Sequence, residues 1–96
     1  MRLRLLSRAT RDMRDIFEFI EQDNPEAAKD VARRLIASLQ LVAQNPSMGR
    51  PSKTKNSREW SIPGLPYMVP YRVRGNAIEV LRIYHTSRNR PEKRPS

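Results

Sequence analysis

Residues 16–28, IFEFIEQDNPEAA, contain the junction that decides the fold. Asn24 can accept hydrogen bonds from the first free N–H groups of a following helix, and Pro25 suits the first helical position. Glu26 places a negative charge at the positive end of that helix's dipole. Because the residues before the junction also have helical periodicity, this stretch predicts two helices joined by almost no loop, a helical hairpin.

Both arms of this hairpin have one apolar face. The first helix is expected to begin near a capping Ser7 or Thr10 and to run to about residue 23, and the second to run from Pro25 to about Gln44. Apolar side chains recur at helical spacing at Met13, Ile16, Phe17 and Ile20 and then at Ala28, Val31, Leu35, Leu39 and Val42. The acidic residues of the first helix, Asp12 among them, fall mostly between these positions and are expected to face solvent.

Alternating segments on both sides of the hairpin predict strands. Leu3 and Leu5 alternate with arginines near the N-terminus, and further strands are expected over residues 58–62, 67–73 and 77–84. Pro70 removes one backbone donor and therefore predicts an edge or a bulge. The last strand is apolar on both faces, which predicts a central position with one face under the helices.

This order of elements predicts an α+β fold, an antiparallel sheet with the helical hairpin packed on one face. Ninety-six residues are expected to form a single domain, residues 1–96. Within it we expect the hairpin at about 8–44, the C-terminal sheet at about 58–85 and a basic tail at 86–96.

The charge is strongly positive and unevenly placed. The formal net charge is +9, and residues 49–96 hold eleven Lys/Arg against three Asp/Glu, whereas residues 1–48 hold eight against seven. Such a balance favours polyanionic or acidic partners, so on charge alone a simple nucleic-acid-binding module is one candidate function of the chain. The absence of cysteine excludes disulfides and thiolate sites, and no apolar run resembles a signal peptide or a membrane span, so we expect a cytoplasmic protein without membrane contacts.

Four segments together resemble the RelE/ParE superfamily of toxins. They are residues 16–28 (IFEFIEQDNPEAA), 45–51 (NPSMGRP), 65–73 (LPYMVPYRV) and 78–88 (IEVLRIYHTSR). Each is weakly specific alone, but all four occur in family order and span nearly the whole chain. The resemblance implies a strand–helix–helix–strand–strand–strand domain that is the toxin of a bacterial type II toxin–antitoxin pair, with a cognate antitoxin encoded beside it.

The resemblance implies one of two activities. RelE-like members enter the ribosomal A site and cleave mRNA without a metal ion, whereas ParE-like members inhibit DNA gyrase by binding. RNA cleavage needs positive groups around the scissile phosphate, with a base and an acid. The positions matching RelE's basic residues hold Glu59, Ser61 and Met68, which favours the ParE-like branch; the RelE-like endoribonuclease remains the alternative.

Candidate site residues gather near the last two strands. If the chain is a ribonuclease, His85, Arg88 and Arg72 are the catalytic candidates, although a lone histidine at a strand end often serves only a local hydrogen bond. Arginines at alternate strand positions share a face and can bind phosphate or carboxylate groups of a target. The alternative is that they are charges at the sheet edge that contact only solvent. The target-binding candidates are Arg72, Arg74, Arg82, Tyr84, His85, Arg88 and Arg90. We expect no cofactor, no metal site and no small-molecule substrate.

Overall fold

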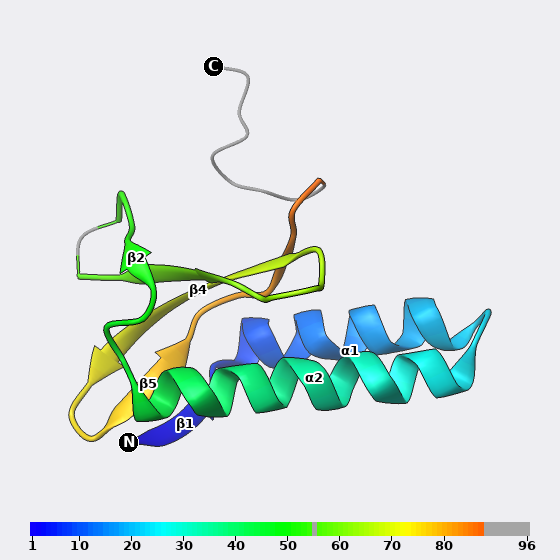
Figure 1. Cartoon of the computed structure of the whole chain (residues 1–96), viewed down its shortest axis with the longest axis horizontal. Helices are drawn as coiled ribbons and strands as arrows, with labels where there is room; N and C mark the ends of the chain where they lie inside the picture. Colours follow the sequence, from blue (N-terminus) through cyan, green and yellow to red (C-terminus); the bar gives the residue numbers. More distant parts are fainter. Residues whose placement is uncertain (55, 88–96) are drawn as a thin grey trace.

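The computed structural model describes residues 1–54 and 56–87, and within these ranges the hairpin forms as expected. Helix α1 spans Ser7–Glu21 and α2 spans Pro25–Gln44, and the two lie side by side along one face of a sheet (Figure 1). Asn24 caps α2 by accepting a 3.1 Å hydrogen bond from the Ala27 N–H. The expected cap of α1 was wrong: Ser7 is already helical, and the capping position is Leu6, which makes no side-chain capping bond to the described residues.

The described residues form a six-stranded sheet in the order β1-β5-β4-β3-β2, with β6 also paired to β4. The strands are β1 Arg2–Leu5, β2 Arg50–Pro51, β3 Arg58–Ser61, β4 Tyr67–Arg74, β5 Ala77–Val80 and β6 Tyr84–His85. The expected α+β fold, with the helical hairpin on one face of the sheet, is confirmed, but the sheet is mixed rather than antiparallel throughout, because β1 runs parallel to β5. The helical hairpin and the strands that follow it provide the long crossover that a parallel pair requires.

The expected last strand, residues 77–84, is interrupted by a bulge. Three steps along β4, from Tyr71 to Met68, lie opposite four steps from Val80 to Tyr84, so one extra residue is inserted. Pro70 accepts a 2.9 Å hydrogen bond from the Leu81 N–H but has no N–H to return. The prediction that Pro70 marks an edge or a bulge is confirmed as a bulge.

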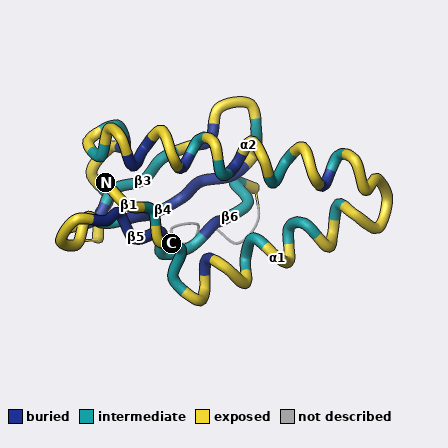
Figure 2. The backbone as a smooth tube through the Cα atoms, turned by 90° about the horizontal axis from the view of Figure 1, so that it is seen from below, coloured by how far each residue is buried: buried dark blue, intermediate teal, exposed yellow. Residues whose placement is uncertain are grey.

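The core lies between the helices and the sheet. Leu35 and Leu39 of α2 pack with Val69 of β4 and Val80 of β5, and all four are fully buried. Exposed residues follow the outer sides of both helices, while β4 and β5 carry much of the buried chain (Figure 2). Trp60 packs on α2, where its Nε1–H donates to the Ser38 hydroxyl at 3.0 Å. Neither described helix combines the length and apolar character that crossing a membrane requires.

Candidate functional site

The face of the sheet opposite the helices, called here the open face, contains a groove of about 680 Å³. Residues directly opposite in a strand pair share a face and alternate along each strand, which places Met68, Pro70 and Leu81 on this side. They form an apolar floor. The walls come from residues 50–54 with Ser57 and Glu59 on one side and from Arg82 and Tyr84 on the other.

The groove wall that contains Arg50 is held in place by a buried tyrosine, Tyr71. The Tyr71 hydroxyl donates to the Pro46 carbonyl at 2.6 Å and accepts from the Gly49 N–H at 3.0 Å. A Cβ at Gly49 would lie 2.7 Å from both that hydroxyl and the Glu59 carbonyl oxygen, so the chain can pass here only as glycine. These bonds hold the following residue, Arg50, where its guanidinium approaches the Glu59 carboxylate at 3.4 Å.

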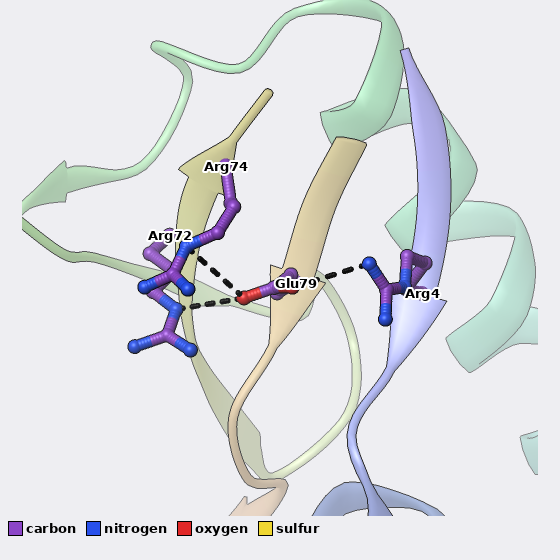
Figure 3. A network of polar contacts seen from close by, with 4 residues as sticks. All are labelled: Arg4, Arg72, Arg74 and Glu79. Atoms are coloured by element: carbon purple, nitrogen blue, oxygen red, sulfur yellow. Dashed lines mark hydrogen bonds and ion pairs between the residues drawn. The ribbon is translucent and has the colours of Figure 1, made fainter. Parts of the chain in front are cut away.

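A cluster of three arginines, Arg4, Arg72 and Arg74, surrounds a buried carboxylate on the same open face. Glu79 of β5 lies between Arg4 of β1, at 3.4 Å, and the two β4 arginines, at 2.8 and 3.9 Å (Figure 3). Hydrogen bonding to Arg72 holds the pKa of the Glu79 carboxyl below its ordinary value despite burial, and the charges of all three arginines add to this effect. Three cations share one anion here, so positive charge is left in excess.

Another arginine, Arg82, has its charge neutralised by a carboxylate of the same chain. Its Nε and Nη2 donate to both Asp12 oxygens at 2.8 and 3.2 Å, and Asp12 also accepts from the Ile83 N–H at 2.8 Å. Hydrogen bonding to Asp12 raises the pKa of Arg82, whose guanidinium lies 4.8 Å from the Tyr84 ring centre. The expectation that Asp12 faces solvent was wrong, because this carboxylate joins α1 to the bulge.

His85 lies on the other side of the sheet from the groove. It pairs with Tyr67, a core residue, and their rings meet edge to face at 5.5 Å. Its Nδ1 accepts from the Ser87 N–H at 3.2 Å. Without the bulge, alternation would put His85 on the same face as Glu79; the inserted residue turns it to the helix side and turns Tyr84 to the open face.

With this geometry in view, comparison with known proteins identifies the family. Residues 3–90 match the model of the ParE toxin of the type II toxin–antitoxin system parDE. The chain belongs to the ParE toxin family. It is therefore a type II toxin of the RelE/ParE superfamily, as the four sequence segments predict.

Individual relatives agree with the family assignment. The chain is 34% identical over 91 residues to putative toxin Y4kP of Sinorhizobium fredii, covering 95% of this chain and 94% of that one. It is 36% identical to toxin ParE1 of Caulobacter vibrioides, covering 90% of each, and 35% identical to toxin RelE1 of the same organism, covering 81% and 85%. A solved structure of a chromosomal ParDE TA system from P. aeruginosa superposes with a TM-score of 0.79 at 26% identity, covering 88% of this chain and 95% of that chain.

The three positions that the resemblance matches to basic residues of RelE are Glu59, Ser61 and Met68, and none of them is a cation. Glu59 and Met68 line the groove, and Ser61 is exposed at the end of β3. The described residues hold no cluster of His, Cys, Asp or Glu side chains suited to a metal ion. Of the candidate site residues, Arg88 and Arg90 lie outside the described residues, whereas Arg72 and Arg74 share the open face as their spacing predicts.

The sequence analysis did not predict two residues that form ion pairs at this site, Arg4 and Asp12. Arg4 reaches Glu79 only because β1 and β5 are adjacent and parallel, with Arg4 directly opposite Glu79. Asp12 and Arg82 are 70 residues apart in sequence. The alternation of Leu3 and Leu5 with arginines does place Arg4 on the polar side of its strand, but nothing local indicates which strand lies beside it.

Proposed function

We propose that this toxin inhibits growth by binding a macromolecular target, DNA gyrase, without cleaving nucleic acid, and that a cognate antitoxin neutralises it. The observation that carries the proposal is the composition of the open-face groove. Its floor is apolar, and Glu59 occupies a position where a metal-free ribonuclease needs a cation. Of the three cations in its walls, Arg50 lies 3.4 Å from Glu59 and Arg82 is paired with Asp12, which leaves Lys53. The family match to the parDE toxin supports the same branch.

The arrangement of the other candidates also supports binding over cleavage. His85 lies across the sheet from the groove, and Ser87 occupies its Nδ1. Arg82 is committed to Asp12. A general base and a phosphate-stabilising cation must lie on the same side of a substrate, within hydrogen-bond reach of the reacting atoms.

The alternative is a RelE-like, ribosome-dependent mRNA endoribonuclease. It is favoured by one observation, the 35% identity to a relative named toxin RelE1. In that case His85, Arg88 and Arg72 would be the catalytic candidates.

The two readings differ in what happens first after induction. Binding to gyrase predicts blocked supercoiling by the purified chain and intact transcripts during the first minutes in cells. We expect His85→Ala to keep toxicity, because this residue lies away from the groove. Deletion of residues 86–96 should remove it, because that segment holds four of the eleven basic residues of the C-terminal half. Primer extension showing prompt cuts at A-site codons, lost in His85→Ala, would instead establish the ribonuclease.

The antitoxin proposal has its own test. The ParDE structure from P. aeruginosa is described as a toxin–antitoxin system, and this family member has a large excess of positive charge. We expect the protein encoded by the adjacent reading frame to co-elute with the toxin on gel filtration in moderate salt. Separate elution of the two chains would contradict neutralisation by that neighbour.

A further inference from the structure

We propose that a pocket at the edge of the sheet, called here the edge pocket, binds phosphate groups of a nucleic-acid backbone. It has a volume of about 730 Å³. One side comes from residues 71–74 of β4 and the other from described residues between Pro51 and Arg58. It shares part of the loop after β2 with the groove but none of the apolar floor. The inference goes beyond the proposed function, because it requires neither gyrase nor an antitoxin.

The edge pocket exists because β3 stops pairing before β4 ends. The last pair between the two strands is Arg58 with Tyr71, whereas β4 continues beside β5 beyond this point. The Pro70 carbonyl points to the β5 side, where it accepts from the Leu81 N–H, so the backbone groups of Tyr71 and Val73 point to the β3 side. Among the described residues, β3 offers no partner to the Val73 N–H. Val73 is 46% exposed, so this donor can reach a ligand.

The described lining of the edge pocket contains three arginines and no carboxylate. Arg72 and Arg74 come from β4, and Arg58 comes from β3. Arg58 is oriented by a 2.6 Å hydrogen bond that its Nη1 donates to the Gly49 carbonyl. Arg72 donates through Nε to Glu79, and its two terminal nitrogens point away from that carboxylate (Figure 3). Guanidinium groups that are held in this way keep donors available for an anion.

These donors fit a phosphate better than a carboxylate. They belong to a β3 side chain, to two β4 side chains and to the Val73 backbone, so they approach a ligand from different directions. A phosphate group presents several oxygens in a tetrahedral arrangement, whereas a carboxylate presents two oxygens in one plane. The groove differs, because Glu59 lines it and repels an anion. Guanidinium and backbone N–H groups are the usual contacts to nucleic-acid phosphates, which favours a nucleic-acid backbone in the edge pocket.

The test measures binding of labelled single-stranded oligonucleotides to the full chain by fluorescence anisotropy. Oligo-dT, oligo-dA and oligo-dC of roughly eight nucleotides are compared over a range of salt concentrations. We expect similar affinities for the three sequences and a loss of affinity as salt is raised, because the contacts are with the backbone. An Asp-rich peptide of the same net charge should bind at least about tenfold more weakly. Displacement of the oligonucleotide by an equal concentration of inorganic phosphate would mean that the pocket binds the free anion, and would overturn the nucleic-acid assignment.

One variant and a matched control locate the charge. Arg74→Gln should weaken every oligonucleotide by about three- to tenfold and reduce the log–log slope of the salt dependence by about 0.7, as expected for one lost phosphate contact. Arg4→Gln removes the same charge from the same arginine cluster but lies outside the edge pocket, so it should change the affinity by less than about twofold. Thermal unfolding verifies that both variants keep the fold. An equal loss in Arg4→Gln would show that only net charge attracts the oligonucleotide and would overturn the proposal.

The Val73 amide reports whether the oligonucleotide lies in the edge pocket. With ¹⁵N-valine labelling, the Val73 signal should shift on binding, while that of Val42, which is fully buried on α2, should not. An unchanged Val73 signal in the bound state, no binding of any oligonucleotide, or tighter binding of the Asp-rich peptide would each overturn the proposal. None of these measurements contains gyrase, so the proposal can fail while inhibition of gyrase succeeds, and the reverse.

Discussion

The two sides of the sheet satisfy their polar groups in opposite ways. On the helix side, Tyr71 bonds to Pro46 and Gly49, and Trp60 bonds to Ser38. On the open face, three arginines share the single carboxylate of Glu79. These polar groups of the helix side find their partners within the chain, whereas the open face carries positive charge that a partner can neutralise.

Two arginine sites differ in the same way, the Arg82–Asp12 pair at one wall of the groove and the arginine cluster. Arg82 and Asp12 form a one-to-one pair with two hydrogen bonds, and their side chains are only 27% and 14% exposed. Such a pair stabilises the junction of α1 with the bulge and leaves no net charge. The arginine cluster is more exposed and has positive charge in excess. We therefore expect substitutions on the helix side to change stability and substitutions of the open-face arginines to change binding.

The largest loss of stability is expected from a substitution in the core between the helices and the sheet. Leu35 is fully buried between α2 and the sheet, so Leu35→Ala should lower the free energy of unfolding by about 2–5 kcal/mol through lost burial and a cavity. Leu41→Ala on the same helix is the control, because this side chain is largely exposed, and should cost less than about 1 kcal/mol. Chemical denaturation measures both. Similar losses at the two positions would mean that the buried face of α2 is assigned wrongly.

A smaller loss of stability is expected from a substitution where α1 contacts the bulge. Asp12→Ala leaves the Arg82 guanidinium and the Ile83 N–H without their acceptor, which should cost about 2–3 kcal/mol. Asp15→Ala, at an exposed position of α1, should cost less than about 0.5 kcal/mol. A double-mutant cycle with Arg82→Gln should give a coupling free energy of about 1 kcal/mol or more. A coupling near zero would show that this pair contributes no more than an ordinary surface contact.

The parts of the fold set by local chemistry were predictable from the sequence. The Asn24-Pro25-Glu26 junction and the apolar spacing of α2 specify the hairpin within a few residues. The pairing of β1 with β5 was not predictable in the same way, because the sequence between them fixes neither which strands become neighbours nor their direction. The family resemblance agrees with the element order predicted from the residues, but it does not give the register.

The candidate site was predictable to the same extent. The alternation of Arg72 with Val73 and Arg74 correctly placed both arginines on one face. The alternation beyond Val80 failed, because the bulge inserts one residue and exchanges the faces of all positions after it. Pro70 indicated that a bulge was possible. The sequence did not show that the extra residue lies on the strand opposite Pro70, and this position is what turns His85 to the helix side.

The smallest effect at neutral pH is expected on the open face, from Glu79→Gln. The amide keeps the shape of the side chain, and the three arginines remain in contact with water, so the loss of stability at pH 7 should be smaller than for Asp12→Ala. The pKa of Glu79 in the folded chain lies below its ordinary value of 4.5, so the carboxylate stabilises the folded state above about pH 4.5. That contribution is lost as the pH falls through the lower folded value.

The difference in unfolding free energy between the wild type and Glu79→Gln should therefore shrink as the pH is lowered from about 5 toward 3. Glu18→Gln, on exposed α1, changes the net charge equally and allows the general effect of charge to be subtracted. Denaturant titrations at a series of pH values measure all three proteins. A Glu79→Gln difference that stayed constant with pH would contradict the prediction. A difference at pH 7 as large as the loss in Asp12→Ala would show that the Glu79 carboxylate mainly stabilises the fold. A decreasing difference, with intact folding at pH 7, would leave Glu79 the narrower role of holding three arginines in place for a partner.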